Sequence, residues 1–266
     1  MFLKTKILAK NIRIKVLDMM YYSKSAHLAS CFSCVDILAV IYENILKISP
    51  GYFNNVNRHR FILSKGHAAA AYYAAMYFKK ILTKKEIDSF CKVNSLLEEH
   101  PSIKLKGVEA ATGSLGHGLN IACGIALGAK IKKKNFKTFV LMSDGECNEG
   151  TVWEAAIFAY SKKLNNLYAI VDSNRWQATE RTKIIAPGSL SDQFKAFGWN
   201  VKIINGHNYK QIYSSFLNKV INTKPTLIIA NTIKGKGVSF MEDDNNWHYK
   251  YPNQLELFKA KQEIIK

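Results

Sequence analysis

The chain has 266 residues, of which 48% are hydrophobic and 12% aromatic, and its formal net charge is +18. These values exclude an intrinsically disordered chain and suit one large α/β domain. The lysines are scattered, and Lys132–Lys134 is the only run of three. We therefore expect no nucleic-acid partner, although a positive field also attracts phosphorylated sugars, diphosphate cofactors or an acidic partner chain.

The cysteines and the apolar segments indicate the compartment. Five cysteines are an odd number, and neither a secretory signal nor an apolar stretch of membrane-spanning length is present. We expect reduced thiols in a cytoplasmic protein that does not contact a membrane. Cys31 and Cys34 have C-x-x-C spacing, but no second pair or suitably spaced histidine completes a zinc site. Both thiols are expected to pack in the core beside a helix start.

The first half of the chain predicts several helices and one short strand. A helix is expected over Ala9–Tyr22, then a loop over Ser25–Ser33, then a second helix from Ser33 with Asp36 in a capping-box-like position. Arg60–Ser64 is a predicted strand before an alanine-rich helix, Thr83–Glu86 has capping-box spacing, and Gly113–Gly118 forms a loop that opens a helix to about Lys134.

The second half alternates regularly between apolar strands and helical segments. Strands are predicted at Thr138–Met142, Leu167–Asp172, Val201–Ile204 and Thr226–Asn231. This rhythm indicates an α/β fold with a mainly parallel, doubly wound sheet covered by helices on both faces. We expect a single domain over residues 1–266, with N-terminal helices in 1–58, a core in 59–240 and a tail in 241–266.

Polar residues follow two of the predicted strands. Asp144 follows one strand within Met142–Glu146, and Asn174 follows the next within Asp172–Asn174. Ligands of open parallel sheets bind beyond the carboxyl ends of the strands, and Mg²⁺ prefers oxygen ligands. With the carbonyl of Trp176, these side chains could hold Mg²⁺ against a diphosphate near the helix expected from about Glu149. The alternative is that Asp144 and Asn174 are helix caps or turn formers.

The surrounding motifs resemble those of a known family. An Asp-Gly pair followed by Asn about 30 residues later is the thiamine-diphosphate and magnesium motif. Further segments resemble transketolase, and they occur in the same order from about residue 10 to 255. The segments that carry it are Ser64–Ala68, Gly107–Glu109, Thr112–Gly116, Asp144–Gly145 with Asn174, and Lys234–Glu242.

The resemblance implies roles for individual residues. Asp144, Asn174 and the carbonyl of Trp176 would bind Mg²⁺, or Ca²⁺ or Mn²⁺ in its place. His27, His67, His100 and His248 would surround the reactive carbon of the cofactor and the first carbons of the sugar, where histidines donate hydrogen bonds or move protons. The alternative for each is a surface or core histidine, and His59 and His207 match no catalytic position. Residues implied to contact thiamine diphosphate are His67, Gly113, Ser114, Leu115, Asp144, Gly145, Glu146, Asn174 and His248.

The sequence departs from the family pattern at three places. Ser143 replaces the usual glycine before the metal-binding aspartate, Ala26–Ser30 replaces Gly-His-Pro-Gly-Gly, and His117 stands where glutamine is common. All three changes are compatible with cofactor binding, and the change at Ala26–Ser30 alters the loop that meets the sugar. They resemble transketolase-like paralogues of sugar and surface-polysaccharide pathways.

The resemblance also implies a partner. Full transketolases have a pyrimidine-binding domain with the activating glutamate and a C-terminal domain, which 266 residues cannot accommodate. We expect the N-terminal subunit of a split transketolase, which forms a heterotetramer with a C-terminal subunit and transfers two-carbon ketol units between sugars. The alternatives are a subunit of a 2-oxo acid dehydrogenase or deoxyxylulose-phosphate type synthase, a non-catalytic scaffold subunit, and a nucleic-acid-binding protein.

Overall fold

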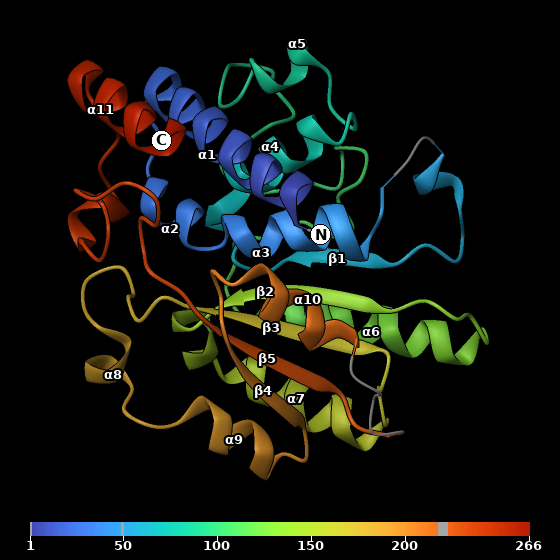
Figure 1. Cartoon of the computed structure of the whole chain (residues 1–266). Coiled ribbons are helices and arrows are strands. Elements are labelled where there is room, and N and C mark those ends of the chain that lie inside the picture. Colours follow the sequence, from blue (N-terminus) through green and yellow to red (C-terminus); the bar gives the residue numbers. More distant parts are fainter. Residues whose placement is uncertain (1, 49–50, 218–222) are drawn as a thin grey trace.

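The computed structural model describes residues 2–48, 51–217 and 223–266, in which five parallel strands form one sheet in the order β1-β2-β3-β5-β4 (Figure 1). Each of the five predicted strands is confirmed to within one residue at its ends. Their bounds are β1 (Arg60–Leu63), β2 (Thr138–Ser143), β3 (Leu167–Ser173), β4 (Asn200–Asn205) and β5 (Thr226–Asn231).

Alternating side chains divide the apolar core into two layers. Successive residues of a strand point to opposite faces, so the paired Phe61 and Phe139 lie in one layer and the paired Ile62 and Val140 lie in the other. β2 and the first six residues of β3 are buried throughout. Strands covered on both faces are apolar on both faces, which explains why these runs lack polar alternation.

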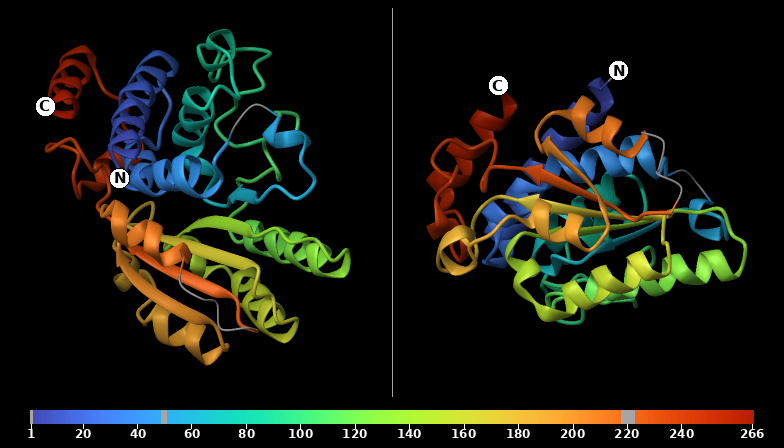
Figure 2. Two further views of the ribbon diagram at one scale, coloured as in Figure 1. Left: turned by 45° about the vertical axis from the view of Figure 1, so that its right-hand side comes forward. Right: turned by 90° about the horizontal axis from the view of Figure 1, so that it is seen from below.

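Helices cover the two faces of the sheet (Figures 1 and 2). One face is covered by α1 (Leu3–Ser23), α2 (Leu28–Ser33), α3 (Val35–Val40), α4 (Ala69–Phe78) and α10 (Tyr209–Leu217), with α11 (Gln254–Ile265) packed against α1. The other face carries α6 (His117–Ile131), α7 (Gly150–Ser161) and α9 (Leu190–Ala196), and α5 (Lys84–Ile87) and α8 (Thr182–Ile185) are short. Among the described helices, none combines the length and hydrophobicity needed to cross a bilayer.

Three expectations for the helices were wrong, and one was confirmed. The first helix, α1, begins at Leu3 and not at the predicted Ala9. Residues 28–33 form α2 instead of continuing a loop, because His27 turns the chain with a φ of 73° and every residue of α2 is buried. Asp36 does not cap α3, since its carboxylate accepts hydrogen bonds from Arg13 instead. Thr83 and Glu86 form the predicted capping box of α5.

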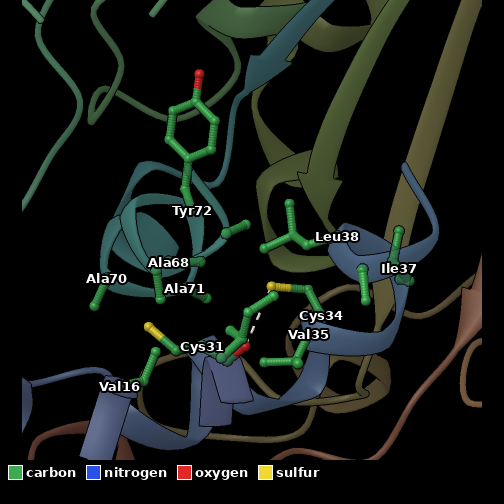
Figure 3. Close-up of a cluster of buried hydrophobic side chains, with 14 of the residues drawn as sticks. Val16, Cys31, Cys34, Val35, Ile37, Leu38, Ala68, Ala70, Ala71 and Tyr72 are labelled. Carbon is green, nitrogen blue, oxygen red and sulfur yellow. Dashed lines mark hydrogen bonds between the residues drawn. The ribbon is translucent and has the colours of Figure 1, made fainter. Parts of the chain in front are cut away.

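The thiols of Cys31 and Cys34 lie in the apolar core between α2, α3 and α4 (Figure 3). The Cys34 thiol donates to the carbonyl of Cys31 at 3.3 Å, and burial raises the pKa of Cys31 to about 11. Both side chains have no exposed surface, so the expected packing role is confirmed.

Candidate functional site

The carboxyl ends of four neighbouring strands bring the candidate site together. Lys65 follows β1, Asp144 follows β2, Asn174 follows β3 and Lys234 follows β5. All four side chains are nearly or fully buried. Because parallel strands end at the same edge of a sheet, residues far apart in the sequence meet there.

Asp144 is held in one orientation by three donors. Its Oδ1 accepts from the backbone N–H of Gly145 at 3.0 Å, and its Oδ2 accepts from Arg175 N–H at 2.8 Å and Thr182 Oγ1 at 3.1 Å. Burial, followed by the charge of Asp172, raises the pKa of Asp144 to about 6. A carboxylate destabilised in this way gains from a cation, and its Oδ1 retains a lone pair for one.

The Asn174 amide is oriented by its neighbours. Its Oδ1 accepts from Trp176 N–H at 3.0 Å, and its Nδ2 donates to Ser33 Oγ at 3.3 Å. The Trp176 side chain is fixed by the guanidinium of Arg181, 3.8 Å from the ring centroid, and by its Nε1–H bond to Asp243 at 2.8 Å. The predicted metal ligands Asp144, Asn174 and Trp176 therefore belong to one hydrogen-bonded loop.

A buried ion pair lies directly behind this loop. Lys65 Nζ donates to Asp172 Oδ2 at 2.5 Å and to the Ser30 carbonyl at 3.0 Å. Ser33 Oγ donates to the same carboxylate oxygen at 2.5 Å, and Thr232 Oγ1 donates to the other. Burial alone would lower the pKa of Lys65, but Asp172 outweighs it and raises the pKa, so the amine keeps its charge. This pair joins the ends of β1, β3 and β5 to α2.

Gly113 lies where two other segments approach its backbone. A Cβ on Gly66 would lie 2.8 Å from Gly113 N, and a Cβ on Gly113 would lie 3.0 Å from His100 Cδ2. Gly113 has a φ of 147°, which disfavours residues with a side chain. His100 therefore packs on the loop Gly113–Gly118, called the glycine loop below, in which Ser114 is exposed and Leu115 is half-buried.

Glu146 is fully buried and its carboxylate is occupied by protein donors. Oε1 accepts from Gly116 N–H at 2.9 Å and from Ser64 Oγ, and Oε2 accepts from Ser143 N–H at 3.2 Å. Burial raises its pKa, and the Ser64 hydroxyl opposes that shift. Glu146 thus ties the glycine loop to the ends of β1 and β2.

His27, His67 and His248 form a cluster. Their ring centroids lie 5.3 Å (His27–His67), 5.0 Å (His27–His248) and 6.2 Å (His67–His248) apart. The backbone N–H of His27 also donates to the backbone carbonyl of His248 at 2.8 Å. Burial is the largest cause that lowers the pKa of each, to about 3 for His248. All three rings are therefore neutral at pH 7, and each has one N–H to donate.

Lys234 is a site residue that the sequence did not assign. Its Nζ lies 2.6 Å from Asn245 Oδ1 and 2.8 Å from His248 Nδ1. Burial, followed by the charge of Lys65, lowers the pKa of Lys234 to about 7. The Lys234–Glu242 motif contained this residue, but nothing in its spacing indicated that the amine would meet His248.

Unused polar atoms at the site fit a metal-bound diphosphate. Gln177 Nε2 is buried and has no hydrogen-bond partner within the described residues, and its Cγ would lie 2.9 Å from a Cβ on Gly145. No three His, Cys, Asp or Glu side chains in the described part of the chain converge as a metal site. A cation at Asp144 would thus depend on amide and carbonyl oxygens and on ligand oxygens, as Mg²⁺ does when it binds phosphates.

A cavity of about 1050 Å³ opens beside Asp144. The loop after Asn174, the start of α9 and the ends of β4 and β5 surround it. Arg175, Arg181 and Lys183 are among its lining residues, whereas the three clustered histidines and Lys234 are not. His117, which begins α6, is exposed and lies outside the contacts described above.

The chain is similar to known proteins over nearly its whole length. Residues 4–263 match the family model described as transketolase, thiamine diphosphate binding domain. The chain is 37% identical over 254 residues to one subunit of the apulose-4-phosphate transketolase of Phocaeicola vulgatus, covering 95% of this chain and 90% of that one. It is 36% identical to human transketolase, of which it spans 39%. The crystal structure of Campylobacter jejuni transketolase superposes with a TM-score of 0.89 at 30% identity, over 98% of this chain and 42% of that one.

Proposed function

The chain belongs to the transketolase family, whose thiamine-diphosphate-binding domain it forms, and we propose that it is the cofactor-holding subunit of a two-chain transketolase. In this proposal all 266 residues form one domain. The reaction transfers a two-carbon ketol unit from a ketose to an aldose. One observation carries the proposal: the side-chain oxygens of Asp144 and Asn174 lie at the same sheet edge as Lys65, Lys234 and the histidine cluster.

The polar groups of the site suggest how the cofactor is held. Asp144, Asn174 and the Trp176 carbonyl would bind Mg²⁺, or Ca²⁺ or Mn²⁺ in its place. Gly113, Ser114, Leu115 and Gly145 would line the cofactor, while Glu146 positions the glycine loop through Gly116. When bound, thiamine diphosphate supplies the nucleophilic carbon that makes and breaks carbon–carbon bonds.

Charge favours a diphosphate at this position. The amines of Lys65 and Lys234 are buried near Asp144, and the charge of Asp144 acts on Lys234. The Gln177 Nε2 donor, packed on Gly145, has no partner within the described residues. An anion with several acceptor oxygens would pair with the Lys234 amine and the Gln177 amide at once. The Lys65 amine, whose Nζ is bound to Ser30, Ser33 and Asp172, would add its positive charge without a direct contact.

The histidines supply hydrogen-bond donors for the sugar. A charged Lys234 donates to His248 Nδ1, so the His248 proton lies on Nε2. Neutral His27, His67 and His248 can then donate to a ketose hydroxyl or carbonyl oxygen and take part in moving its proton. His100, which packs on Gly113, is proposed to act with them.

The partner and the substrate are also proposals. The chain spans 90% of a relative that is named as one subunit of its enzyme, but 39% of human transketolase. We therefore propose a separate C-terminal subunit with the pyrimidine-binding domain, and a heterotetramer of the two chains in the cytoplasm. The name of the Phocaeicola relative favours a phosphorylated ketose such as apulose 4-phosphate as donor. The loop Ala26–Ser30 and His117 are candidates for sugar specificity.

Asp144→Ala tests the metal assignment. We expect wild-type protein to bind thiamine diphosphate in Mg²⁺ and not in EDTA, and the variant to lose the Mg²⁺-dependent binding, because no other carboxylate is proposed to contact the ion. Isothermal titration calorimetry measures both. Asp192→Ala is the matched control, since its carboxylate lies on the exposed face of α9. Unchanged binding by Asp144→Ala would remove Asp144 from the metal site.

A further inference from the structure

His207 has no role in the site described above, yet both ring nitrogens are engaged. Its Nδ1 lies 2.8 Å from Asp36 Oδ2, and its Nε2 accepts the backbone N–H of Ile233 at 2.9 Å. A backbone N–H can only donate, so Nε2 is unprotonated and the proton lies on Nδ1. The imidazole therefore connects a carboxylate of α3 to the first residues after β5.

Asp36 is the centre of a buried network. Its two oxygens accept from Arg13 Nη1 at 3.1 Å and Nη2 at 2.8 Å, and Oδ1 also accepts from Tyr209 Oη at 2.9 Å. Burial would raise its pKa, but Arg13 and His207 outweigh burial and lower it. The carboxylate therefore stays ionised and holds both Arg13 and His207 by charge-assisted hydrogen bonds.

Arg13 gives the network a second contact with the same backbone segment. Its Nε donates to the carbonyl of Lys236 at 2.9 Å. His207 holds Ile233 and Arg13 holds Lys236, so the two contacts flank Lys234 and Gly235. Gly235 has a φ of 78°, and its N–H donates to the Ala29 carbonyl at 3.0 Å. The backbone that carries Lys234 is thus held on each side.

We propose that His207 and Arg13, both held by Asp36, are positioning residues that fix the Ile233–Lys236 segment and so place the Lys234 amine beside His248 at the cofactor site. The inference rests on the proposed function, because it assigns Lys234 to cofactor binding. His207 touches neither Lys234 Nζ nor the metal-binding loop, and acts through the backbone of Ile233.

Two substitutions at His207 separate positioning from general packing. In His207→Gln, the side-chain oxygen can occupy the place of Nε2 and accept from Ile233. In His207→Asn, the shorter amide can occupy the place of Nδ1 and reach Asp36, but it cannot accept from Ile233. A purely structural role predicts similar effects of both substitutions, whereas positioning predicts that glutamine rescues and asparagine does not.

Hydrogen–deuterium exchange of the full chain, with no cofactor added, tests whether His207 fixes the Ile233–Lys236 segment. We expect the peptide covering residues 232–237 to exchange faster in His207→Asn and at the wild-type rate in His207→Gln. Tyr209→Phe is the control, since it removes one donor to Asp36 without touching the segment, and should leave the exchange unchanged. Equal exchange in the Asn and Gln variants, fast or slow, would overturn the proposal.

Calorimetric titration with thiamine diphosphate and Mg²⁺ tests whether fixing this segment strengthens cofactor binding through Lys234. His207→Asn should bind roughly tenfold more weakly than wild type, the scale of effect seen for outer-shell partners, and His207→Gln should bind as wild type does. If exchange differs between the variants but affinity does not, the network does not serve Lys234, and the proposal fails. If exchange differs and wild-type protein binds no cofactor, the proposed function fails while the fixation of the segment by His207 stands.

Discussion

Lys234 shows how burial prepares one side chain for an anion. Its pKa is lowered to about 7, first by burial and then by the charge of Lys65, so at pH 8 most of the amine is neutral. A diphosphate bound nearby would favour the charged form and raise that pKa again. In the proposed function, Lys234 would therefore take up a proton when the anion binds.

Thiamine diphosphate binding at pH 8 is expected to take up roughly one proton at Lys234, since a nearby opposite charge raises the pKa of an amine. Asp144 adds little at this pH, because its pKa of about 6 leaves it ionised already. Calorimetry in two buffers of different ionisation enthalpy measures the proton number. Lys234→Met should remove most of the uptake. An unchanged proton number in that variant would contradict the assignment.

Single residues differ in how far the sequence could predict them. Asp144 and Asn174 were predicted to lie near one another because each follows a strand of a parallel sheet, and the structure joins them through Arg175 N–H. Lys65 and Asp172 are 107 residues apart and meet only through the strand order, which no local pattern encodes. His207 was set aside because it matches no catalytic position of the family. Its partners, on α3 and after β5, reach it only in the folded chain.

At the scale of elements, the strand ends are joined by the buried Lys65–Asp172 pair. Removing one partner of such a pair leaves an uncompensated buried charge, so Lys65→Met is expected to lower the free energy of unfolding by about 3–5 kcal/mol. The double variant Lys65→Met/Asp172→Asn should cost less than the sum of the single variants. Urea denaturation measures each value. Lys84→Met, in the exposed pair with Asp88, is the control and should change stability little.

Gly66, in the turn that follows β1, packs closely on the Gly113–Gly118 loop. Gly66→Ala places a methyl group 2.8 Å from Gly113 N, so the loop must move and the melting temperature should fall. Gly124→Ala is the matched control. Gly124 lies within α6, and a Cβ there would meet no neighbouring side chain or segment within 4 Å. It should raise the melting temperature, since alanine is favoured over glycine within helices. Differential scanning calorimetry compares the two, and equal shifts would contradict the close approach.

Elements were predictable where a local pattern determined them. The five strands followed from short, mainly apolar runs, although β4 is only partly buried, and α5 followed from its capping box. The start of α2 was not predictable, because it depends on His27 adopting a left-handed conformation and on six residues packing into the core. The strand order β1-β2-β3-β5-β4 likewise depends on contacts between distant segments.

One edge of the sheet carries the proposed metal ligands, the two buried lysines and the histidine cluster. In the proposed enzyme this is one side of an active site, and the second chain supplies the pyrimidine-binding side with its glutamate. The formal charge of +18 would favour association with an acidic partner surface and with phosphorylated sugars.

The measurement that tests this account most directly is ketol transfer by this chain with and without a chain that carries the pyrimidine-binding domain. Apulose 4-phosphate or another phosphorylated ketose serves as donor, and mass spectrometry detects an aldose lengthened by two carbons. The account predicts product only when both chains, thiamine diphosphate and Mg²⁺ are present. Transfer by this chain alone at the rate of the pair, or none by the assembled pair with any ketose donor, would contradict it.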